Sequence, residues 1–453
     1  MKRKGTSLVL MFLITVLLET PFSATNIVIK PVEQNHERHS VLQTCLNGGW
    51  LEEREGVKIL HLNGSYYDMG YQHGFLLSDE IGEVMRAQLV LFENGGYTYE
   101  KLLEVWNIMD DYLPHEYHEE MQGMADGAGM SFEDVAVLSM IPAVFNVPFE
   151  DACCEISLWG KATVDGKLLH VRSWDWGLHI SDPETGKLLQ ENIVLIVRNP
   201  EVGHASMIPE FAGAICSWHG INDKGIAVGE NTCVTQDTTF HGISPAFRMR
   251  MVLDRSDTGE EALDILTSNR TCGTNFVLSD ANVPIGYALD QTANISYFGT
   301  WDNPVEGTYP FWMIEDVTRR IPSYIDPECA AVELGRIRYD PSGLRGLLDA
   351  LLGKSYKVFP WIHYRALSNQ IEKYYGTLDV NNSMTALREE YKCETDFWMF
   401  LSKEFLQWQC LYQWVACPET GDMVISFASS DKRACYEPVH YFNFFELMEA
   451  DPP

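Results

Sequence analysis

The chain has 453 residues, enough for one large core or two to three ordinary domains, and 46% of them are apolar, as in globular proteins. It carries 33 Lys and Arg residues against 64 Asp and Glu residues, so its formal net charge at pH 7 is −31. Such a charge repels phosphate backbones. The composition therefore argues against a largely disordered chain and against a nucleic-acid partner, and the acidity suits a secreted or lysosomal protein as well as simple solubility.

The first residues have the pattern of a secretory signal peptide. A basic stub at residues 2–4 precedes an apolar run at 8–18, and two small residues follow at 23–24. The run is shorter than the roughly 20 apolar residues that a membrane-spanning helix needs, and no later stretch is long and apolar enough. We therefore expect residues 1–24 to be a signal peptide and the protein to be secreted or lysosomal, without a spanning segment.

Four N-x-Ser/Thr triplets agree with a secretory route, because they are acceptors for N-glycosylation in eukaryotes. They begin at Asn63, Asn269, Asn294 and Asn381. Each triplet is common by chance, so together they only support the signal peptide.

The cysteines number eleven, an odd count for a compartment in which thiols tend to pair. The one left over is either a buried free thiol or a thiol kept free for chemistry. If Cys153 is set aside, ten remain, and four of them lie near the C-terminus: Cys393, Cys410, Cys417 and Cys435. We expect these four to be disulfide partners, with a connectivity that the sequence does not reveal.

Helical patterns dominate the part of the chain before the adjacent cysteines at 153 and 154. Apolar residues recur at helical spacing from 66 to 92, which predicts one long amphipathic helix or two shorter ones. Further helices are expected at 99–112, 115–124 and 131–141. The last of these opens with Ser131 and Asp134, a capping pair.

After residue 152 the apolar pattern changes to period two. Strands are predicted at residues 154–161, 167–174, 192–198, 214–218, 225–231 and 275–279. The first two are joined by Val164-Asp165-Gly166, a hairpin signal. Helices are expected at 259–267, capped by Asp257 or Thr258, and near 342–352 and 361–375. Strands and helices in separate blocks indicate an α+β fold.

Two adjacent cysteines stand at the head of the predicted hairpin. If Cys153 were the first residue of a mature fragment, its own α-amino group, with a reference pKa of about 7.7 to 8.0, could take the thiol proton. Arg172 could then favour the thiolate and Asp175 could hold the amine. The same residues also fit a structural role, with Cys153 and Cys154 in the core or in disulfides and Arg172 in an ion pair.

The run from Cys153 to Asp175 resembles the N-terminal nucleophile (Ntn) hydrolases with a cysteine nucleophile. This group includes acid ceramidase, N-acylethanolamine amidase, bile-salt hydrolases and the isopenicillin N acyltransferase family. Cys-Cys-Glu-Ile at 153–156 is similar to the opening of the ceramidase group, and the glycine-rich phrases at 69–74 and 124–129 are similar to the acyltransferase group. The resemblance covers most of residues 60–300. It implies a four-layer αββα fold, in which helices flank two stacked antiparallel sheets.

The resemblance gives roles to five residues. It implies that Cys153 is the nucleophile, that Arg172 orients or activates it and that Asp175 binds its amine. Asn231 resembles the family asparagine that donates to the oxyanion, and Asn275 resembles the second family asparagine. Two positions depart from the family pattern: Ser173 stands where Asn is usual, and Ala152 stands where Gly is more usual. Cys153 is preferred to Cys154 because the phase of the motif fits it better.

The resemblance also implies self-cleavage between Ala152 and Cys153. The signal peptide 1–24 would then be followed by a mainly helical light fragment, 25–152, and a catalytic heavy fragment, 153–453, which remain associated. The expected reaction is hydrolysis or acyl transfer at a linear amide of a small, lipid-like N-acyl substrate, through a cysteine thioester. No metal or organic cofactor is expected.

Two other interpretations stay open. One is a phospholipase B-like ester hydrolase of the same nucleophile class, and the other is a disulfide-rich secreted binding protein without catalysis. His115 and His118 have one residue too few between them for a zinc helix motif. Trp159, Trp174 and Trp176 are expected to pack against the sheet rather than to contact a substrate, although an aromatic wall near the nucleophile would suit an acyl chain.

Overall fold

The structure is a computed structural model that describes residues 45–46, 48–144, 153–334, 358–392, 410–430 and 432–452. These residues lie within one compact unit, Gln43–Pro453. The expected signal peptide, the bond between residues 152 and 153, Cys393 and the helix expected near 342–352 lie outside the described residues, so these expectations stay predictions.

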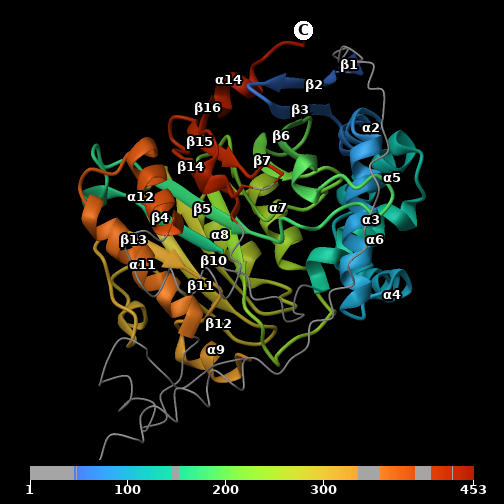
Figure 1. Cartoon of the computed structure of the whole chain (residues 1–453). Coiled ribbons are helices and arrows are strands. Elements are labelled where there is room, and N and C mark those ends of the chain that lie inside the picture. Colours follow the sequence, from blue (N-terminus) through green and yellow to red (C-terminus); the bar gives the residue numbers. More distant parts are fainter. Residues whose placement is uncertain are drawn as a thin grey trace, which may run out of the picture. The chain divides into compact units, whose positions relative to one another are not determined.

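Two β-sheets form the centre of the unit (Figure 1). The larger sheet contains, in spatial order, β1 (Cys45–Leu46), β2 (Gly49–Arg54), β3 (Val57–Gly64), β6 (Ile193–Pro200), β7 (Ser206–Phe211), β8 (His219–Asn222), β9 (Ile226–Thr232), β10 (Thr274–Asp280), β11 (Ile285–Gln291) and β12 (Ser296–Gly299). The smaller sheet contains β13 (Val317–Arg320), β4 (Cys154–Leu158), β5 (Leu169–Asp175), β14 (Cys410–Ala416), β15 (Asp422–Phe427) and β16 (His440–Asn443). Neighbouring strands are antiparallel, except that β3 and β6 are parallel.

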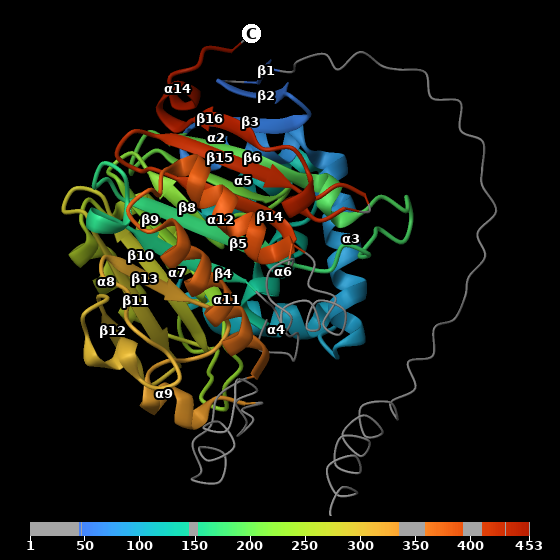
Figure 2. The same cartoon turned by 60° about the vertical axis from the view of Figure 1, so that its left-hand side comes forward.

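Helices cover the outer faces of both sheets. On the side of the larger sheet lie α2 (Tyr66–Leu76), α3 (Ser78–Asn94), α4 (Tyr99–Met109), α5 (His115–Ala128), α6 (Phe132–Met140), α7 (Pro245–Arg255) and α8 (Gly259–Thr267). The smaller sheet is covered by α11 (Val358–Tyr374) and α12 (Val380–Lys392), which face the reader in Figure 2. Short helices are α9 (Pro327–Val332) and α14 (Phe444–Met448). The order helix, sheet, sheet, helix confirms the predicted α+β fold with four layers.

The inner faces of the two sheets bury apolar side chains against each other. Leu195, Met207 and Ile221 of the larger sheet belong to one buried cluster with Trp414 and Ile425 of the smaller sheet. Successive side chains along a strand point to opposite faces of the sheet, so the same strands also present a second set of residues to the helices. The period-two pattern of apolar residues after residue 152 arises because alternate residues of each strand face the inner, apolar side of a sheet.

The predicted helix starts are confirmed by their capping bonds. The backbone N–H of Asp134 donates to the Ser131 hydroxyl at 3.1 Å, and the Ser131 N–H donates to the Asp134 carboxylate at 3.2 Å. Thr258, not Asp257, caps α8, and it does so reciprocally with Glu261. The stretch 66–92 forms two helices, α2 and α3, rather than one.

Two strand predictions are wrong in detail. β4 ends at Leu158, so the connection to β5 is a longer loop than the tight turn that Asp165-Gly166 suggests. Residues 214–218 do not form a strand. Their carbonyl groups bond to buried guanidinium groups instead, because Ala214 accepts from Nη2 of Arg198 at 2.9 Å and Ile215 accepts from Nη1 of Arg250 at 2.6 Å.

Helices α2 and α5 approach so closely that glycine is required at their contact. Gly70 and Gly74 of α2 meet the backbone of α5, and Gly123 and Gly127 of α5 meet the backbone of α2. A Cβ atom at position 123 would fall well inside contact distance of the carbonyl oxygen of Tyr67. The glycine-rich phrases at 69–74 and 124–129 thus have a packing reason.

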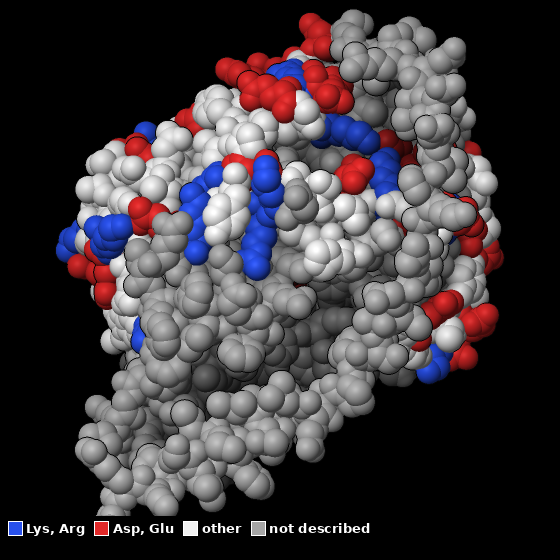
Figure 3. Space-filling view, viewed as in Figure 1, with Lys and Arg blue, Asp and Glu red and all other residues white. Residues whose placement is uncertain are grey.

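On the face of the molecule in Figure 3, the Lys and Arg side chains of the described residues lie among Asp and Glu side chains. No single helix within the described ranges is long and apolar enough to cross a bilayer, although α5 together with the chain from Phe132 to Val144 passes the same test as a pair bent by 120°.

Replacing Gly123 by Ala is expected to lower the free energy of unfolding by about 2 kcal/mol, since the added methyl group meets backbone rather than a movable side chain. Urea denaturation measures this change. Gly82→Ala in α3 is the matched control, because the new Cβ would meet only the end of the Arg86 side chain. The control should be neutral or slightly stabilising. Equal stability of both variants would contradict the close contact.

Candidate active site

The hairpin of β4 and β5 places Cys153 beside the residues predicted to assist it. Cys153 directly precedes β4, and the register pairs Cys154 with Ser173 and Glu155 with Arg172. The Sγ atom of Cys153 lies 3.5 Å from the backbone nitrogen of Asp175 and 4.0 Å from its carbonyl oxygen. The hairpin therefore brings Cys153, Arg172 and Asp175 together.

The two adjacent cysteines face opposite sides of the smaller sheet. Cys153 packs in the cluster that contains Trp174 and Trp176, whereas Cys154 packs in the cluster under α11 and α12. Burial, followed by the negative charges of Glu390 and Asp175, raises the pKa of Cys154 well above its ordinary value. A thiol held in the neutral form is a poor nucleophile. This environment favours Cys153 over Cys154.

Arg172 is fully buried between the sheets. Its Nη1 donates to the Glu155 carboxylate and to the carbonyl oxygen of Glu230, which is part of the peptide unit that leads into Asn231. Burial alone would lower the pKa of Arg172, but the negative charge of Glu155, with smaller contributions that include Cys153, raises it overall. Its Nε and Nη2 have no hydrogen-bond partner among the described residues. A charged group with unused donors thus lies near the thiol.

Glu155 was not singled out by sequence reasoning, although a signal for it exists. A strand that begins at residue 154 and pairs with the strand containing Arg172 places a carboxylate directly opposite a guanidinium. Because a buried charge needs a partner, an acidic residue inside an apolar strand opposite an arginine predicts such a pair.

The carboxylate of Asp175 is held by two hydroxyl groups. Ser173 donates to Oδ1 at 3.3 Å and Tyr391 donates to Oδ2 at 3.0 Å. Burial raises the pKa of Asp175 to about 6, while the charge on His363 and the Tyr391 bond act in the opposite direction. Ser173, the departure from the family pattern, therefore supports Asp175. Tyr391 comes from α12, and nothing in the local sequence indicates that it reaches the hairpin.

Asn231 and Asn275 lie opposite each other on β9 and β10. The Nδ2 group of Asn231 donates to Oδ1 of Asn275 at 3.0 Å. The Nδ2 group of Asn275 donates to the carbonyl oxygens of Ile321 and Ser323, at 2.7 Å and 3.2 Å. The Nδ2 group of Asn275 therefore donates to backbone carbonyl groups, while its Oδ1 orients the amide of Asn231. The second N–H of the Asn231 amide stays available as a donor.

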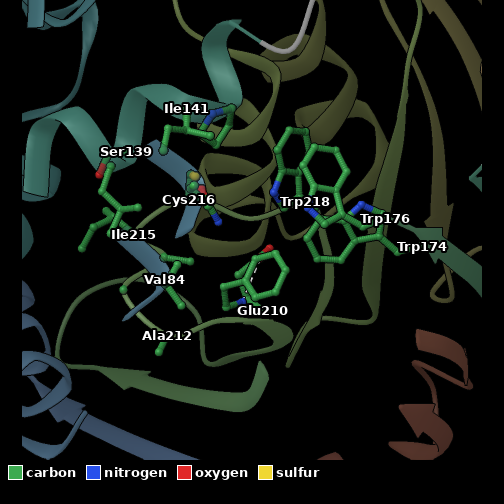
Figure 4. A pocket seen from close by; sticks show the side chains of 16 residues that line it. Val84, Ser139, Ile141, Trp174, Trp176, Glu210, Ala212, Ile215, Cys216 and Trp218 are labelled. Atoms are coloured by element: carbon green, nitrogen blue, oxygen red, sulfur yellow. Dashed lines mark hydrogen bonds between the residues drawn. The ribbon is translucent and has the colours of Figure 1, made fainter. Parts of the chain in front are cut away.

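A cavity lies beside the end of β5, where Trp174 and Trp176 line it on either side of Asp175 in the sequence (Figure 4). It encloses about 470 Å³ of space, part of it open to solvent, and its walls are mostly apolar, with side chains that include Val84, Leu138, Trp174, Trp176, Phe211 and Trp218. Figure 4 shows the three tryptophans together on one side, across from Val84 and Ile215. Trp159 packs elsewhere, in a small cluster with Leu168. Trp174 and Trp176 both pack in the buried core, as expected, and also line this cavity, so contact with a substrate stays a prediction.

The disulfide expectation is not supported where it can be examined. Cys410, Cys417 and Cys435 are free thiols in the structure, so the expected bonds among these three are not formed. Each lies within the apolar core under α11 and α12, where a thiol packs as a small hydrophobic group. Of the sequon asparagines, Asn269, Asn294 and Asn381 are exposed and Asn63 is half-buried. Glycosylation stays a prediction.

Comparison with known proteins supports the resemblance over part of the chain. Residues 166–290 match the family model of acyl-coenzyme A:6-aminopenicillanic acid acyl-transferase. This match begins in the hairpin and includes Arg172, Asp175, Asn231 and Asn275. The predicted resemblance to this group of acyltransferases is confirmed for residues 166–290, a span that does not include Cys153.

Curated relatives include two proteins of Dictyostelium discoideum and one of Archaeoglobus fulgidus. Protein dcd1B is 26% identical over 252 residues, which are 49% of this chain and 47% of the relative. The uncharacterized archaeal protein is 27% identical, over 48% of this chain and 40% of the relative, and protein dcd1A is 23% identical over 73% of each. The chain thus matches less than half the length of the first two.

Solved structures with weak similarity include an N-acylethanolamine-hydrolyzing acid amidase ortholog of Caenorhabditis elegans and a conjugated bile acid hydrolase of Clostridium perfringens. Both are 11% identical; the first covers 59% of this chain and 93% of the solved chain, with a TM-score of 0.37. The second covers 66% of this chain and 95% of the solved chain, with a TM-score of 0.38.

Within the described ranges, no group of three or more His, Cys, Asp or Glu side chains is placed to hold a metal ion.

The raised pKa of Asp175 makes stability depend on pH in the uncleaved chain. Its pKa of about 6 exceeds the ordinary 3.8, so the stabilising contribution is full below pH 3.8 and is lost as the pH rises through 6. This loss amounts to roughly 3 kcal/mol at neutral pH. Asp175→Asn does not titrate, so, in a Cys153→Ala background, it should gain stability relative to its parent between pH 4 and pH 7.

Urea denaturation of both chains across this pH range measures the difference. The Asp175→Asn side chain keeps an amide oxygen that can accept from the Tyr391 hydroxyl, so this hydrogen bond is preserved in the variant. Parallel stability curves for the two chains would contradict a raised pKa at Asp175.

Proposed function

We propose that this chain, whose residues 166–290 match the acyltransferase family model, is a self-processing Ntn-type amidohydrolase or acyltransferase. It acts on a linear amide of an N-acylated substrate through a thioester at Cys153. The observation that carries the proposal is the group formed by the Cys153 thiol, the Asp175 backbone and the charged Arg172, at the edge of an apolar cavity. The expected signal peptide adds a secretory or lysosomal location to the proposal.

Activation of the thiol requires a base near neutral pH. Cleavage before Cys153 would free an α-amino group on the same residue, and this amine would accept the thiol proton. Asp175 is close enough for its backbone to contact Sγ, and its carboxylate would hold the protonated amine. The positive charge of Arg172 would favour the thiolate.

The thiolate then attacks the carbonyl carbon of the amide. Charge develops on the carbonyl oxygen, and the remaining N–H of Asn231 is suited to donate to it because Asn275 fixes the orientation of the amide. Collapse of the intermediate forms the thioester, and the leaving nitrogen takes the proton held by the α-amine. Water, or an acceptor amine, then attacks the thioester and regenerates the thiol.

The cavity suits the acyl part of the substrate. Its walls include aromatic and aliphatic side chains, which suit the hydrocarbon part of an acyl group. Trp174 and Trp176 line the cavity and flank Asp175 in the sequence, whose backbone nitrogen lies 3.5 Å from Sγ of Cys153, so an acyl chain in the cavity could extend toward the thiol.

Cys153→Ala is expected to abolish turnover of an N-acyl fluorogenic amide, by a factor of about 10⁴ or more, and to leave the chain uncut. Cys154→Ala is the matched control, since Cys154 faces the opposite side of the sheet. It should keep cleavage and most of the activity. Iodoacetamide labelling followed by peptide mass mapping should mark position 153 in active protein. Turnover in Cys153→Ala, or its loss only in Cys154→Ala, would reject the assignment.

Asn231→Ala is expected to lower kcat by about 100- to 1,000-fold with little change in KM, because an oxyanion donor acts mainly in the transition state. Asn282→Ala, at an exposed asparagine outside the site, serves as the control and should retain full activity. Steady-state kinetics on the same amide measures kcat and KM for both variants. A pure increase in KM would assign Asn231 to substrate binding rather than to catalysis.

A further inference from the structure

A carboxyl group lies in the wall of the mostly apolar cavity. Glu210 belongs to β7, is 2% exposed and lines the cavity together with Trp174 and Phe211 (Figure 4). Its Oε1 accepts from the backbone N–H of Phe211 at 3.0 Å, whereas its Oε2 has no hydrogen-bond partner among the described residues. A buried oxygen without a partner costs about 1–3 kcal/mol, and a ligand group that bonds to Oε2 would recover this free energy.

The protonation state of Glu210 determines whether its free oxygen donates or accepts a hydrogen bond. Burial is the main cause that raises its pKa to about 8, and the nearby backbone N–H groups of Phe211 and Trp218 and the positive charges of Arg172 and Arg198 act in the opposite direction. The group is therefore mostly protonated at neutral and acidic pH. Because Oε1 already accepts a hydrogen bond, the proton belongs on Oε2, where it forms a donor without a partner.

The charges around the cavity select against a cationic ligand. Arg198 lies behind the cavity wall, where it donates to the carbonyl oxygen of Ala214, and Arg172 lies on the side of the nucleophile. Both guanidinium groups act on Glu210. A ligand ammonium group would be repelled by them, whereas a neutral oxygen can accept from Oε2 without carrying charge into a buried site.

We propose that Glu210 makes the enzyme selective for acyl groups that carry a neutral oxygen substituent, such as a hydroxyl group, on an otherwise apolar chain. The inference rests on the proposed function, because the ligand is the acyl part of the substrate. The apolar walls hold the hydrocarbon, and the carboxyl group bonds to the oxygen. A plain acyl chain would leave Oε2 unpaired, and sites built to bond a polar group discriminate strongly against analogues that lack it.

The test compares fluorogenic amides of straight-chain acyl groups of equal length, one plain and the others with a hydroxyl group at successive positions. In the wild-type enzyme, the best hydroxylated amide should have a kcat/KM at least about 10-fold above that of the plain amide. Glu210→Gln, which keeps the size and a donor, should retain most of this preference. Glu210→Met, which keeps the size alone, should remove or reverse it.

Cys216→Ala is the control, since Cys216 lines the same cavity and its thiol is neutral because burial raises its pKa to about 12. The control should keep the preference for the hydroxylated amide. Equal kcat/KM values for plain and hydroxylated amides in the wild type, or the same preference in Glu210→Met as in the wild type, would overturn the role of Glu210.

Binding separates this inference from the proposed function. Titration calorimetry of the amides with Cys153→Ala should show the same preference without turnover, and it should be lost in Cys153→Ala combined with Glu210→Met. Preferential binding with no turnover by the wild type would uphold the role of Glu210 and contradict the proposed reaction. Turnover by the wild type, with equal kcat/KM and equal binding for plain and hydroxylated amides, would uphold the proposed reaction and contradict the role of Glu210. Tighter binding of an ammonium-bearing acyl amide would also overturn the inference.

Discussion

One buried guanidinium group holds the candidate site together. Arg172 has no exposure to solvent, so its charge must be compensated inside the protein, and an uncompensated buried charge costs several kcal/mol. Its bonds to Glu155 and to the carbonyl oxygen of Glu230 tie together strands of both sheets. Glu155 lies two residues after Cys153, and the bonded carbonyl belongs to the peptide unit before Asn231. The same ion pair thus fixes the region from which the thiol, the carboxylate of Asp175 and the amide of Asn231 all come.

A second set of buried charges shapes the cavity. Arg250 pairs with Glu120 of α5 and with Asp254 of its own helix, and it also bonds to the carbonyl oxygen of Ile215. The backbone N–H of Gly213 donates to His73 of α2 at 2.9 Å. These bonds hold residues 212–218 as a loop against the helices, and the close glycine contact of α2 with α5 supports both partners. The helical layer therefore acts as one wall of the site and not only as a cover for the sheet.

Local sequence patterns predicted the parts of the structure that depend on neighbours in the chain. The capping pairs, the period-two strands and the approach of Arg172 to the cysteines all follow from residues close in sequence. The family resemblance added Asn231 and Asn275, which the register places face to face. Tyr391 and Glu210 carried no such signal, because one acts from a distant helix and the other depends on which side of β7 borders a cavity.

The failed strand prediction has the same physical origin. Residues 214–218 are mostly apolar, like a buried strand, yet the carbonyl groups of Ala214 and Ile215 accept hydrogen bonds from buried arginines. A local sequence pattern does not reveal such tertiary bonds. The disulfide expectation for Cys410, Cys417 and Cys435 came from an inferred compartment rather than from geometry. In the fold these thiols fill apolar core positions, which also weakens the alternative of a disulfide-rich binding protein.

The central claim is that Cys153 becomes an N-terminal residue whose amine and thiol act together. Intact mass and N-terminal sequencing of purified, active protein test it most directly. The account predicts two associated fragments, with the heavier one beginning at Cys153. A single uncut chain with full amidase activity, or a heavy fragment that begins at another residue, would contradict it.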